Sequence, residues 1–300
     1  MRLQDQLFNI RDLVRYALTQ FDQHSLWYGH GTSSPWDEAV ALVFGALGLD
    51  LEGDDRLLDA NLTLAEREKL IELIRRRCEE NIPTPYLLGK AVFHGLTFEV
   101  SSDTLIPRSP IGELITEELQ PWLTREPARI LDLCCGSGCL GILASEVWPE
   151  ADVVLADISE PALAVAERNI DRFEARSRIR TVQSDLLDNL SAHGPFDLVI
   201  CNPPYVDQSD MDSLPAEYHH EPEMALASGP DGLDHWRRIF ADLPGLLAID
   251  AWLVGEVGNS WPALEAAWPK LPLIWPETEG DGGVFMVDAR GLRQGYTPAP

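Results

Sequence analysis

The tetrapeptide Asn202-Pro203-Pro204-Tyr205 holds the residue types that can position a planar NH2 group for reaction. An amide nitrogen is a poor nucleophile because its lone pair is delocalised. The Asn202 side-chain oxygen and the Pro203 carbonyl can accept its two N–H bonds and favour a pyramidal nitrogen in the transition state. Proline fixes the direction of the carbonyl, and Tyr205 can stack on the flat amide. The tetrapeptide predicts group transfer to an amide-type nitrogen, although Asn-Pro-Pro can also form a simple turn.

A second group of residues predicts a nucleoside-containing ligand. An apolar run from Ile130 to Leu133 leads into Cys135-Gly136-Ser137-Gly138-Cys139, so we expect a buried strand, a glycine turn and the start of a helix. Asp157 ends the next apolar run, 21 residues after Gly136, where a carboxylate can accept both hydroxyls of an unphosphorylated ribose. Asp185 and Leu186 end the run after that. This carboxylate can accept the exocyclic amine of adenine while the leucine packs on the ring. Asp185 can also cap a helix, and the two roles can coexist.

The glycine pattern also discriminates between nucleotides. Gly136, Gly138 and Gly141 satisfy the spacing G-x-G-x-x-G of dinucleotide-binding folds. Asp132, however, lies four residues before the first glycine. A carboxylate there would repel a pyrophosphate but tolerate a cationic amino-acid ligand. S-adenosylmethionine carries both an ammonium and a sulfonium group, so we predict it as the cofactor.

Two kinds of periodicity predict the elements that position these residues. Residues 1–88 have apolar residues at helical spacing from Leu3 to Phe21, and further helix starts at Ser34-Pro35 and at Thr63, the latter with a capping box and running towards Glu80. Residues 89–107 suggest a β-hairpin around Gly95.

From Arg129 onward, short β-rich runs alternate with helical segments, which indicates a parallel sheet covered on both faces. In such a sheet the first and fourth strands flank the topological switch point, so the glycine turn and the tetrapeptide should meet in one crevice. The expected strands are Arg129–Cys135, Asp152–Ile158, Ile179–Asp185, Phe196–Asn202, Ala251–Val257 and a last strand from Gly282 to Val287.

The net charge of −26 disfavours stable binding to nucleic acid. The one basic triplet, Arg75-Arg76-Arg77, lies among glutamates of an expected helix, so we expect a solvated, internally paired face. The acidity favours a basic protein partner, or equally serves solubility in a salty cytoplasm, because the chain has only three lysines. His219 to Glu223 follow the tetrapeptide and are expected to form a solvated surface turn.

Other features argue against a membrane protein and against a metal centre. Apolar runs such as Ala39 to Leu49 are far shorter than the roughly 20 residues that a bilayer requires, and the first residues do not resemble a secretory signal. The five cysteines are an odd number and do not suggest a disulfide framework. The C-C-x-x-x-C cluster lacks the paired knuckles of a closed zinc site. We expect a cytoplasmic protein without a bound metal.

Together these residues resemble the class I methyltransferases and, more narrowly, the HemK-type protein-(glutamine-N5) methyltransferases. The resemblance covers nearly the whole chain: the helical N-terminal part, the hairpin, the glycine turn and the tetrapeptide. It implies a Rossmann-like α/β fold with a seven-stranded doubly wound sheet and an antiparallel last strand. It also implies donor contacts and an acceptor site. The donor would contact Cys135 to Cys139, Asp157, Asp185, Leu186 and Asn202, with Asp132 and Arg108 near its amino-acid end, and Asn202 to Tyr205 would hold a glutamine.

Two branches of this family differ after the hairpin. The release-factor branch usually has P-R-P-D-T-E, whereas this chain has Pro107-Arg108-Ser109-Pro110-Ile111-Gly112. That departure and the Cys134-Cys135 doublet are similar to the branch called PrmB, whose substrate is a glutamine of ribosomal protein L-three of the large subunit. Such a basic protein would suit the acidic chain. Release factors, an exocyclic amine of DNA or rRNA, and a non-catalytic binding protein that keeps the fold remain as alternatives.

The sequence thus predicts four parts. They are a helical substrate-recognition domain (1–88), a hairpin linker (89–107), a methyltransferase domain (108–290) and a tail (291–300).

Overall fold

The computed structural model describes residues 3–49, 55–279 and 283–295. The chain divides into two compact units: residues 1–91 with 100–102 and 215–220 form the first, and residues 92–99, 103–214 and 221–300 form the second. The assignment of 215–220 to the first unit differs from the sequence interpretation, which placed this segment in the methyltransferase domain. No helix among the described residues is both long and apolar enough to cross a bilayer.

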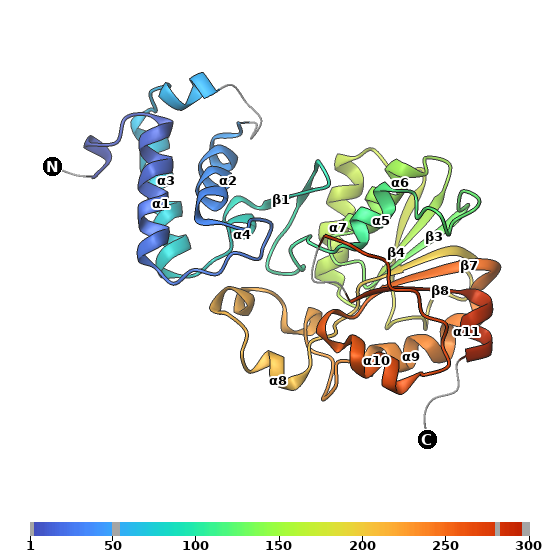
Figure 1. The fold of residues 1–300 in the computed structure, drawn as a ribbon. Coiled ribbons are helices and arrows are strands. Elements are labelled where there is room, and N and C mark those ends of the chain that lie inside the picture. Colours follow the sequence, from blue (N-terminus) through green and yellow to red (C-terminus); the bar gives the residue numbers. More distant parts are fainter. Residues whose placement is uncertain (1–2, 50–54, 280–282, 296–300) are drawn as a thin grey trace. The chain divides into compact units, whose positions relative to one another are not determined.

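The first unit is a small helical bundle (Figure 1). The helix starts at Ser34 and Thr63 are confirmed, because both side chains cap their helices and Glu66 completes the capping box. The first helix begins at Ile10 rather than near Leu3, since the Asn9 side chain accepts the Asp12 N–H at 2.9 Å and ends the preceding turn. The helices are α1 (Ile10–Gln23), α2 (Pro35–Leu47), α3 (Leu64–Glu79) and α4 (Thr84–Leu88), with 3-10 turns at Leu3–Asp5, Asp55–Asp59 and Ala216–His220.

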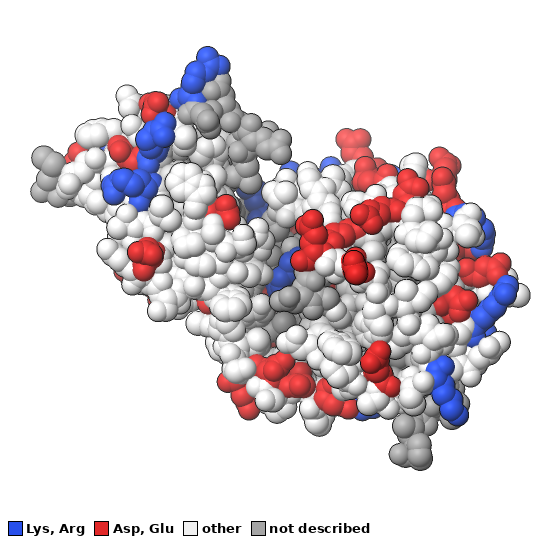
Figure 2. All heavy atoms as spheres, viewed as in Figure 1, with Lys and Arg blue, Asp and Glu red and all other residues white. Residues whose placement is uncertain are grey.

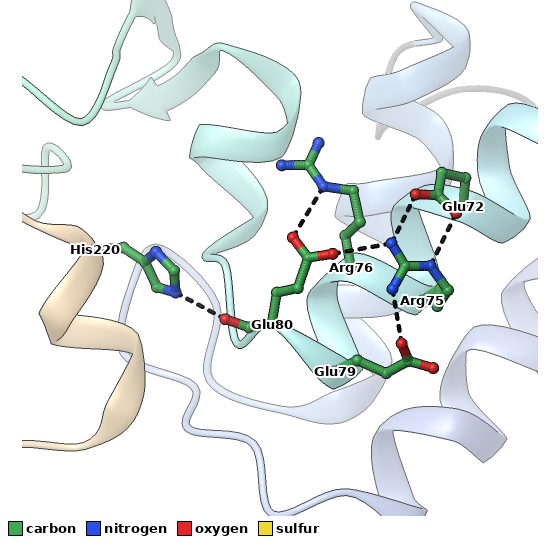
Figure 3. Close-up of polar contacts among 6 residues, drawn as sticks. All are labelled: Glu72, Arg75, Arg76, Glu79, Glu80 and His220. Atoms are coloured by element: carbon green, nitrogen blue, oxygen red, sulfur yellow. Dashed lines mark hydrogen bonds and ion pairs between the residues drawn. The ribbon is translucent and has the colours of Figure 1, made fainter.

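The arginine triplet of α3 divides into an exposed pair and one buried residue. Arg75 and Arg76 pair with carboxylates of their own helix (Glu72, Glu79 and Glu80) at 2.7–3.3 Å, as Figure 3 shows, so the predicted solvated face is confirmed for them. The same picture shows the His220 ring, whose Nε2 lies 2.8 Å from the Glu80 carbonyl oxygen. For Arg77 the prediction is wrong, because its side chain is 1% exposed and pairs with two buried carboxylates from other elements.

The predicted hairpin is present between residues 89 and 107. Strand β1 (Lys90–Phe93) pairs with β2 (Leu96–Glu99), and the turn places His94 and Gly95 at positive φ. Helix α5 (Ile111–Thr116) follows.

The second unit contains a six-stranded sheet of order β5-β4-β3-β6-β7-β8, in which only β8 runs antiparallel to its neighbour. Helices α5, α6 and α7 pack on one face, and α9, α10 and α11 on the other (Figure 1). This is the predicted doubly wound α/β fold with its antiparallel last strand. The strands are β3 (Arg129–Leu133), β4 (Asp152–Asp157), β5 (Ile179–Gln183), β6 (Phe196–Cys201), β7 (Leu247–Glu256) and β8 (Val284–Asp288); the helices are α6 (Cys139–Val147), α7 (Glu160–Arg172), α8 (Gln208–Met211), α9 (Asp234–Asp242), α10 (Trp261–Ala267) and α11 (Ala289–Gly295).

The boundaries differ from the sequence interpretation mainly at the ends of the strands. The first four strands end one or two residues early, because the turn residues that follow leave the ladder. Strand β7 begins at Leu247, four residues before the predicted start. At the sheet edge the place of a seventh strand is taken by an isolated antiparallel bridge between Ile274 and Met286.

The end of the chain is partly helical. Residues 291–295 of the predicted tail belong to α11, while 296–300 lie outside the described residues, as does Gly282 of the predicted last strand.

Candidate active site

A cavity of about 390 Å³ opens at the carboxyl ends of the central strands in the second unit. In the parallel ladder Leu133 pairs with Cys201, so the glycine turn after β3 and Asn202 after β6 emerge side by side. This is the crevice at the topological switch that the sequence predicted. Of the predicted site residues, the cavity wall contains Cys135, Gly136, Ser137, Cys139, Asp157, Asp185, Leu186, Asn202 and Pro204, but not Asp132, Gly138, Pro203 or Tyr205.

Asp157 holds the glycine turn from the end of the neighbouring strand. Its two carboxylate oxygens accept the Gly136 N–H and the Ser159 N–H, each at 2.9 Å. Burial raises the pKa of Asp157, although these hydrogen bonds act in the opposite direction. The carboxylate therefore both shapes the turn and faces the cavity.

The turn itself combines a left-handed backbone with close packing. Gly136 and Gly138 have φ of 55° and 78°, and a Cβ on Gly138 would lie 2.8 Å from the Leu155 side chain. The Ser137 hydroxyl is buried and, apart from the neighbouring Cys139 thiol, has no hydrogen-bond partner among the described residues. Since Ser137 belongs to the cavity wall, this hydroxyl is a ready partner for a polar ligand.

Asp132 lies behind the glycine turn rather than in the cavity wall. The side chain is 1% exposed and accepts the Gly141 N–H at 2.8 Å, in the first turn of α6. Burial raises the pKa of Asp132 to about 7, and the nearby Asp157 adds to the increase. The sequence analysis expected this carboxylate at the ligand, whereas the structure gives it contact only with the helix that supports the turn.

Asp185 forms an ion pair with Arg238 of α9 at 2.8 Å, and both side chains line the cavity. The alternative in which Asp185 caps a helix is wrong, because the residues that follow it form turns. Leu186 is buried against the second face of the sheet.

The acceptor loop, residues 202–205, is held at its far end. The Tyr205 hydroxyl donates to Glu256 Oε1 at 2.7 Å, and the Ser260 hydroxyl donates to the Tyr205 carbonyl at 3.0 Å. Within the described ranges, no hydrogen bond is found to the Asn202 side chain or to the Pro203 carbonyl. Neither predicted acceptor is thus engaged by the described residues, and Asn202 lies in the cavity wall, while the tyrosine hydroxyl is already engaged.

Sequence reasoning missed much of the remaining wall. Residues 103–109 line one side, of which only Arg108 was expected near the donor, and Pro222, Met224 and Ala225 line another. The expected solvated turn at His219–Glu223 is wrong for Glu221, which is buried, accepts two hydrogen bonds from Arg108 at 2.6 and 2.7 Å, and accepts the Ile106 N–H at 3.0 Å. A carboxylate flanked by histidines and proline carries no sequence signal of such a distant arginine partner.

All five cysteines are free thiols. In the part of the chain that the structure describes, no cluster of three or more His, Cys, Asp or Glu side chains has the arrangement of a metal site.

Comparisons with known proteins agree with this geometry. The model of the family "Methyltransferase small domain" matches residues 113–228. Among solved structures, the catalytic domain of hMettl16 in complex with MAT2A 3′UTR hairpin 1 aligns over 93% of this chain and 90% of its own, with a TM-score of 0.52 and 14% identity. The hairpin 6 complex of the same domain gives a TM-score of 0.51 at 15% identity over 74% of this chain and 80% of its own. At such identities the likeness shows the fold alone.

Two relatives are much more similar in sequence. A ribosomal protein uL3 glutamine methyltransferase of Francisella tularensis subsp. tularensis is 42% identical over 261 residues, which cover 86% of this chain and 82% of the relative. A protein of the same name from Bordetella pertussis is 44% identical over 265 residues, covering 87% and 88%. Similarity at this level over nearly the whole length shows that the chain belongs to the family of ribosomal protein uL3 glutamine methyltransferases.

Proposed function

We propose that this methyltransferase transfers a methyl group from S-adenosylmethionine to the side-chain amide nitrogen of a glutamine in ribosomal protein uL3. The observation that carries the proposal is the acceptor loop: Asn202 lies in the wall of the cavity, and both its side-chain oxygen and the Pro203 carbonyl lack partners among the described residues. The shared name of the two relatives supports the choice of substrate.

The residues around the cavity fit the donor. Asp157 would accept the ribose hydroxyls, and the buried Ser137 hydroxyl, which has no partner among the described residues apart from the Cys139 thiol, would bind the polar amino-acid end together with the Gly136 backbone. Asp185 and Leu186 would hold the adenine, while Cys135 and Cys139 pack beside the turn. Bound S-adenosylmethionine supplies a methyl carbon activated by the neighbouring sulfonium.

The acceptor loop would act on the nitrogen rather than on the methyl group. Asn202 Oδ1 and the Pro203 carbonyl accept the two N–H bonds of the glutamine amide, which holds the nitrogen in line and stabilises positive charge as it develops. Such preorganised acceptors need no general base, because the methylated nitrogen is acidic enough to lose its proton to water afterwards. Tyr205, which follows in the same loop, would pack on the amide plane.

Charge supports a basic protein as the partner. The net charge is −26, and carboxylates cover more of the face in Figure 2 than lysine and arginine do. Opposite charge accelerates the encounter with a basic ribosomal protein and repels nucleic acid. A ribosomal substrate also implies the cytoplasm, where ribosomes are assembled.

The test is methylation of purified uL3 in the presence of labelled S-adenosylmethionine, followed by peptide mass spectrometry. We expect one added methyl group on a glutamine side chain. Release factors, total rRNA and DNA serve as parallel substrates. Label in a release factor or in nucleic acid, with none in uL3, would overturn the proposed substrate.

A further inference from the structure

We propose that Glu256 is a positioning residue for the acceptor loop: it fixes Tyr205 through the phenolic hydroxyl and thereby sets the direction of Asn202 and Pro203. The inference rests on the proposed function, because it assigns the loop to the glutamine amide. It concerns a buried side chain that the chemistry described so far does not use.

Glu256 joins the acceptor loop to the cavity wall through its two carboxylate oxygens. Oε1 accepts the Tyr205 hydroxyl at 2.7 Å, and Oε2 accepts the Ser109 hydroxyl. Ser109 lines the cavity and its oxygen also accepts the Ile111 N–H at 3.3 Å, which fixes the serine at the start of α5. Each carboxylate oxygen thus receives a hydroxyl from a different side of the site.

Both ends of the acceptor loop are held by neighbouring residues of strand β7. Cys201, the last residue of β6, pairs in register with Gly255 of β7, and Tyr205 bonds to the next residue, Glu256. Only Asn202 and the two prolines lie between these ends. Because proline restricts the backbone further, a shift of Tyr205 would be transmitted directly to the two acceptor oxygens.

The packing around Tyr205 indicates that the Glu256 carboxylate fixes the position of the ring. Gly258 has a φ of 48°, and a Cβ there would lie 2.4 Å from the tyrosine ring, so the ring rests on bare backbone. The Ser260 hydroxyl fixes the tyrosine carbonyl but does not contact its side chain. Without Glu256 the phenol loses the hydrogen bond at 2.7 Å that directs its hydroxyl, although the backbone remains held.

Burial of Glu256 has an energetic disadvantage for folding. The residue is 5% exposed, and burial raises its pKa although the Ser109 and Tyr205 hydroxyls and Arg108 favour the charged form. An apolar side chain would avoid this desolvation. A buried carboxylate that accepts two hydroxyls gives direction to both, which is what a positioning residue requires.

The test is a double-mutant cycle on the full chain with uL3 as the acceptor. We expect Tyr205→Phe and Glu256→Leu each to lower kcat about tenfold, while the double variant is no slower than either single variant, because both remove one interaction. Glu256→Gln should stay within about threefold of wild type, since its amide oxygen still accepts the phenol. Donor affinity, measured by calorimetry, should not change in any variant.

Three results separate this inference from its alternatives. Independent losses that multiply in the double variant would overturn the coupling between Glu256 and Tyr205. A parallel fall in donor affinity and in thermal stability, also seen in Tyr205→Phe, would show a merely structural role. Wild-type protein that methylates no glutamine of uL3 would instead refute the proposed function, a failure that the wild-type reaction reports before any variant is made.

Discussion

Both units of this chain bury carboxylates in ion pairs, but the second unit also buries carboxylates that have no ion pair among the described residues. In the first unit Arg77 is enclosed with Glu38 and Glu217 at 2.6 and 3.0 Å, and all three side chains are at most 4% exposed. In the second unit Glu221 is likewise paired with Arg108, at 2.6 Å, whereas Asp132 and Glu256, which are 1% and 5% exposed, have no ion pair among the described residues. Their partners are an N–H group and hydroxyls.

The difference separates a structural cluster from a functional one. A buried carboxylate beside a guanidinium is largely neutralised, and its contribution is to hold helices and the 215–220 segment together. Burial without an ion pair raises the pKa of Asp132, Asp157 and Glu256, all in or directly behind the site, although the charge of Arg108 lowers that of Glu256. Acids with perturbed pKa values gathered in this way are typical of a functional site.

The largest effect is expected from breaking the first cluster. Arg77→Met leaves Glu38 and Glu217 buried without their cation, which should destabilise the first unit by about 3–5 kcal/mol. Native-state hydrogen exchange of the α3 amides would measure the loss within that unit.

Arg75→Met is the matched control on the same helix. Arg75 has three carboxylate partners where Arg77 has two, but its side chain is 40% exposed and its partners are solvated, so hydrogen exchange in α3 should hardly change. Equal effects of the two substitutions would contradict the distinction between the buried and the exposed arginine.

Removing the charge of Asp132 in the second unit should instead stabilise the folded protein. The pKa of Asp132 rises from 3.8 to about 7 on folding, so the folded state is destabilised progressively as the pH rises through this interval. Below pH 3.8 both states are protonated and the group contributes nothing. Asp132→Asn should therefore stabilise the free protein by up to about 4 kcal/mol at pH 8 and have little effect at the acid end, as measured by urea unfolding at both pH values. A destabilised variant at pH 8 would show that the carboxylate supports the fold.

A smaller effect is expected on binding of the donor. If the unpaired carboxylates attract a cationic ligand, affinity for S-adenosylmethionine should rise about tenfold as Asp132 ionises between pH 6 and pH 8. Calorimetry in two buffers of different ionisation enthalpy would detect the proton released on binding at pH 6. An affinity that is independent of pH, with no proton release, would remove Asp132 from the electrostatics of the site.

Local signals in the sequence predicted most of the fold. The caps at Ser34 and Thr63 and the glycine turn after β3 depend on neighbouring residues, and all three are confirmed. The convergence of this turn with Asn202 followed from the general topology of doubly wound sheets, and the pairing of Leu133 with Cys201 bears it out.

The errors concern residues whose partners are distant in sequence. Arg77 carries the same signal as Arg75, but only the fold brings Glu217 to it from 140 residues away. Glu221 was expected in solvent, because nothing near it in the sequence indicates a partner. Its partner, Arg108, lies 113 residues earlier. Pairings of this kind depend on tertiary packing, which no local pattern encodes.

Parallel measurement of methyl transfer to uL3 and donor binding in Asn202→Ala tests the proposed chemistry most directly, with Asn61→Ala, an exposed asparagine of the first unit, as the control. We expect kcat to fall about 10²–10³-fold in Asn202→Ala while the Kd for S-adenosylmethionine stays within about twofold of wild type. Turnover close to that of wild type would contradict the role of Asn202 in holding the glutamine amide.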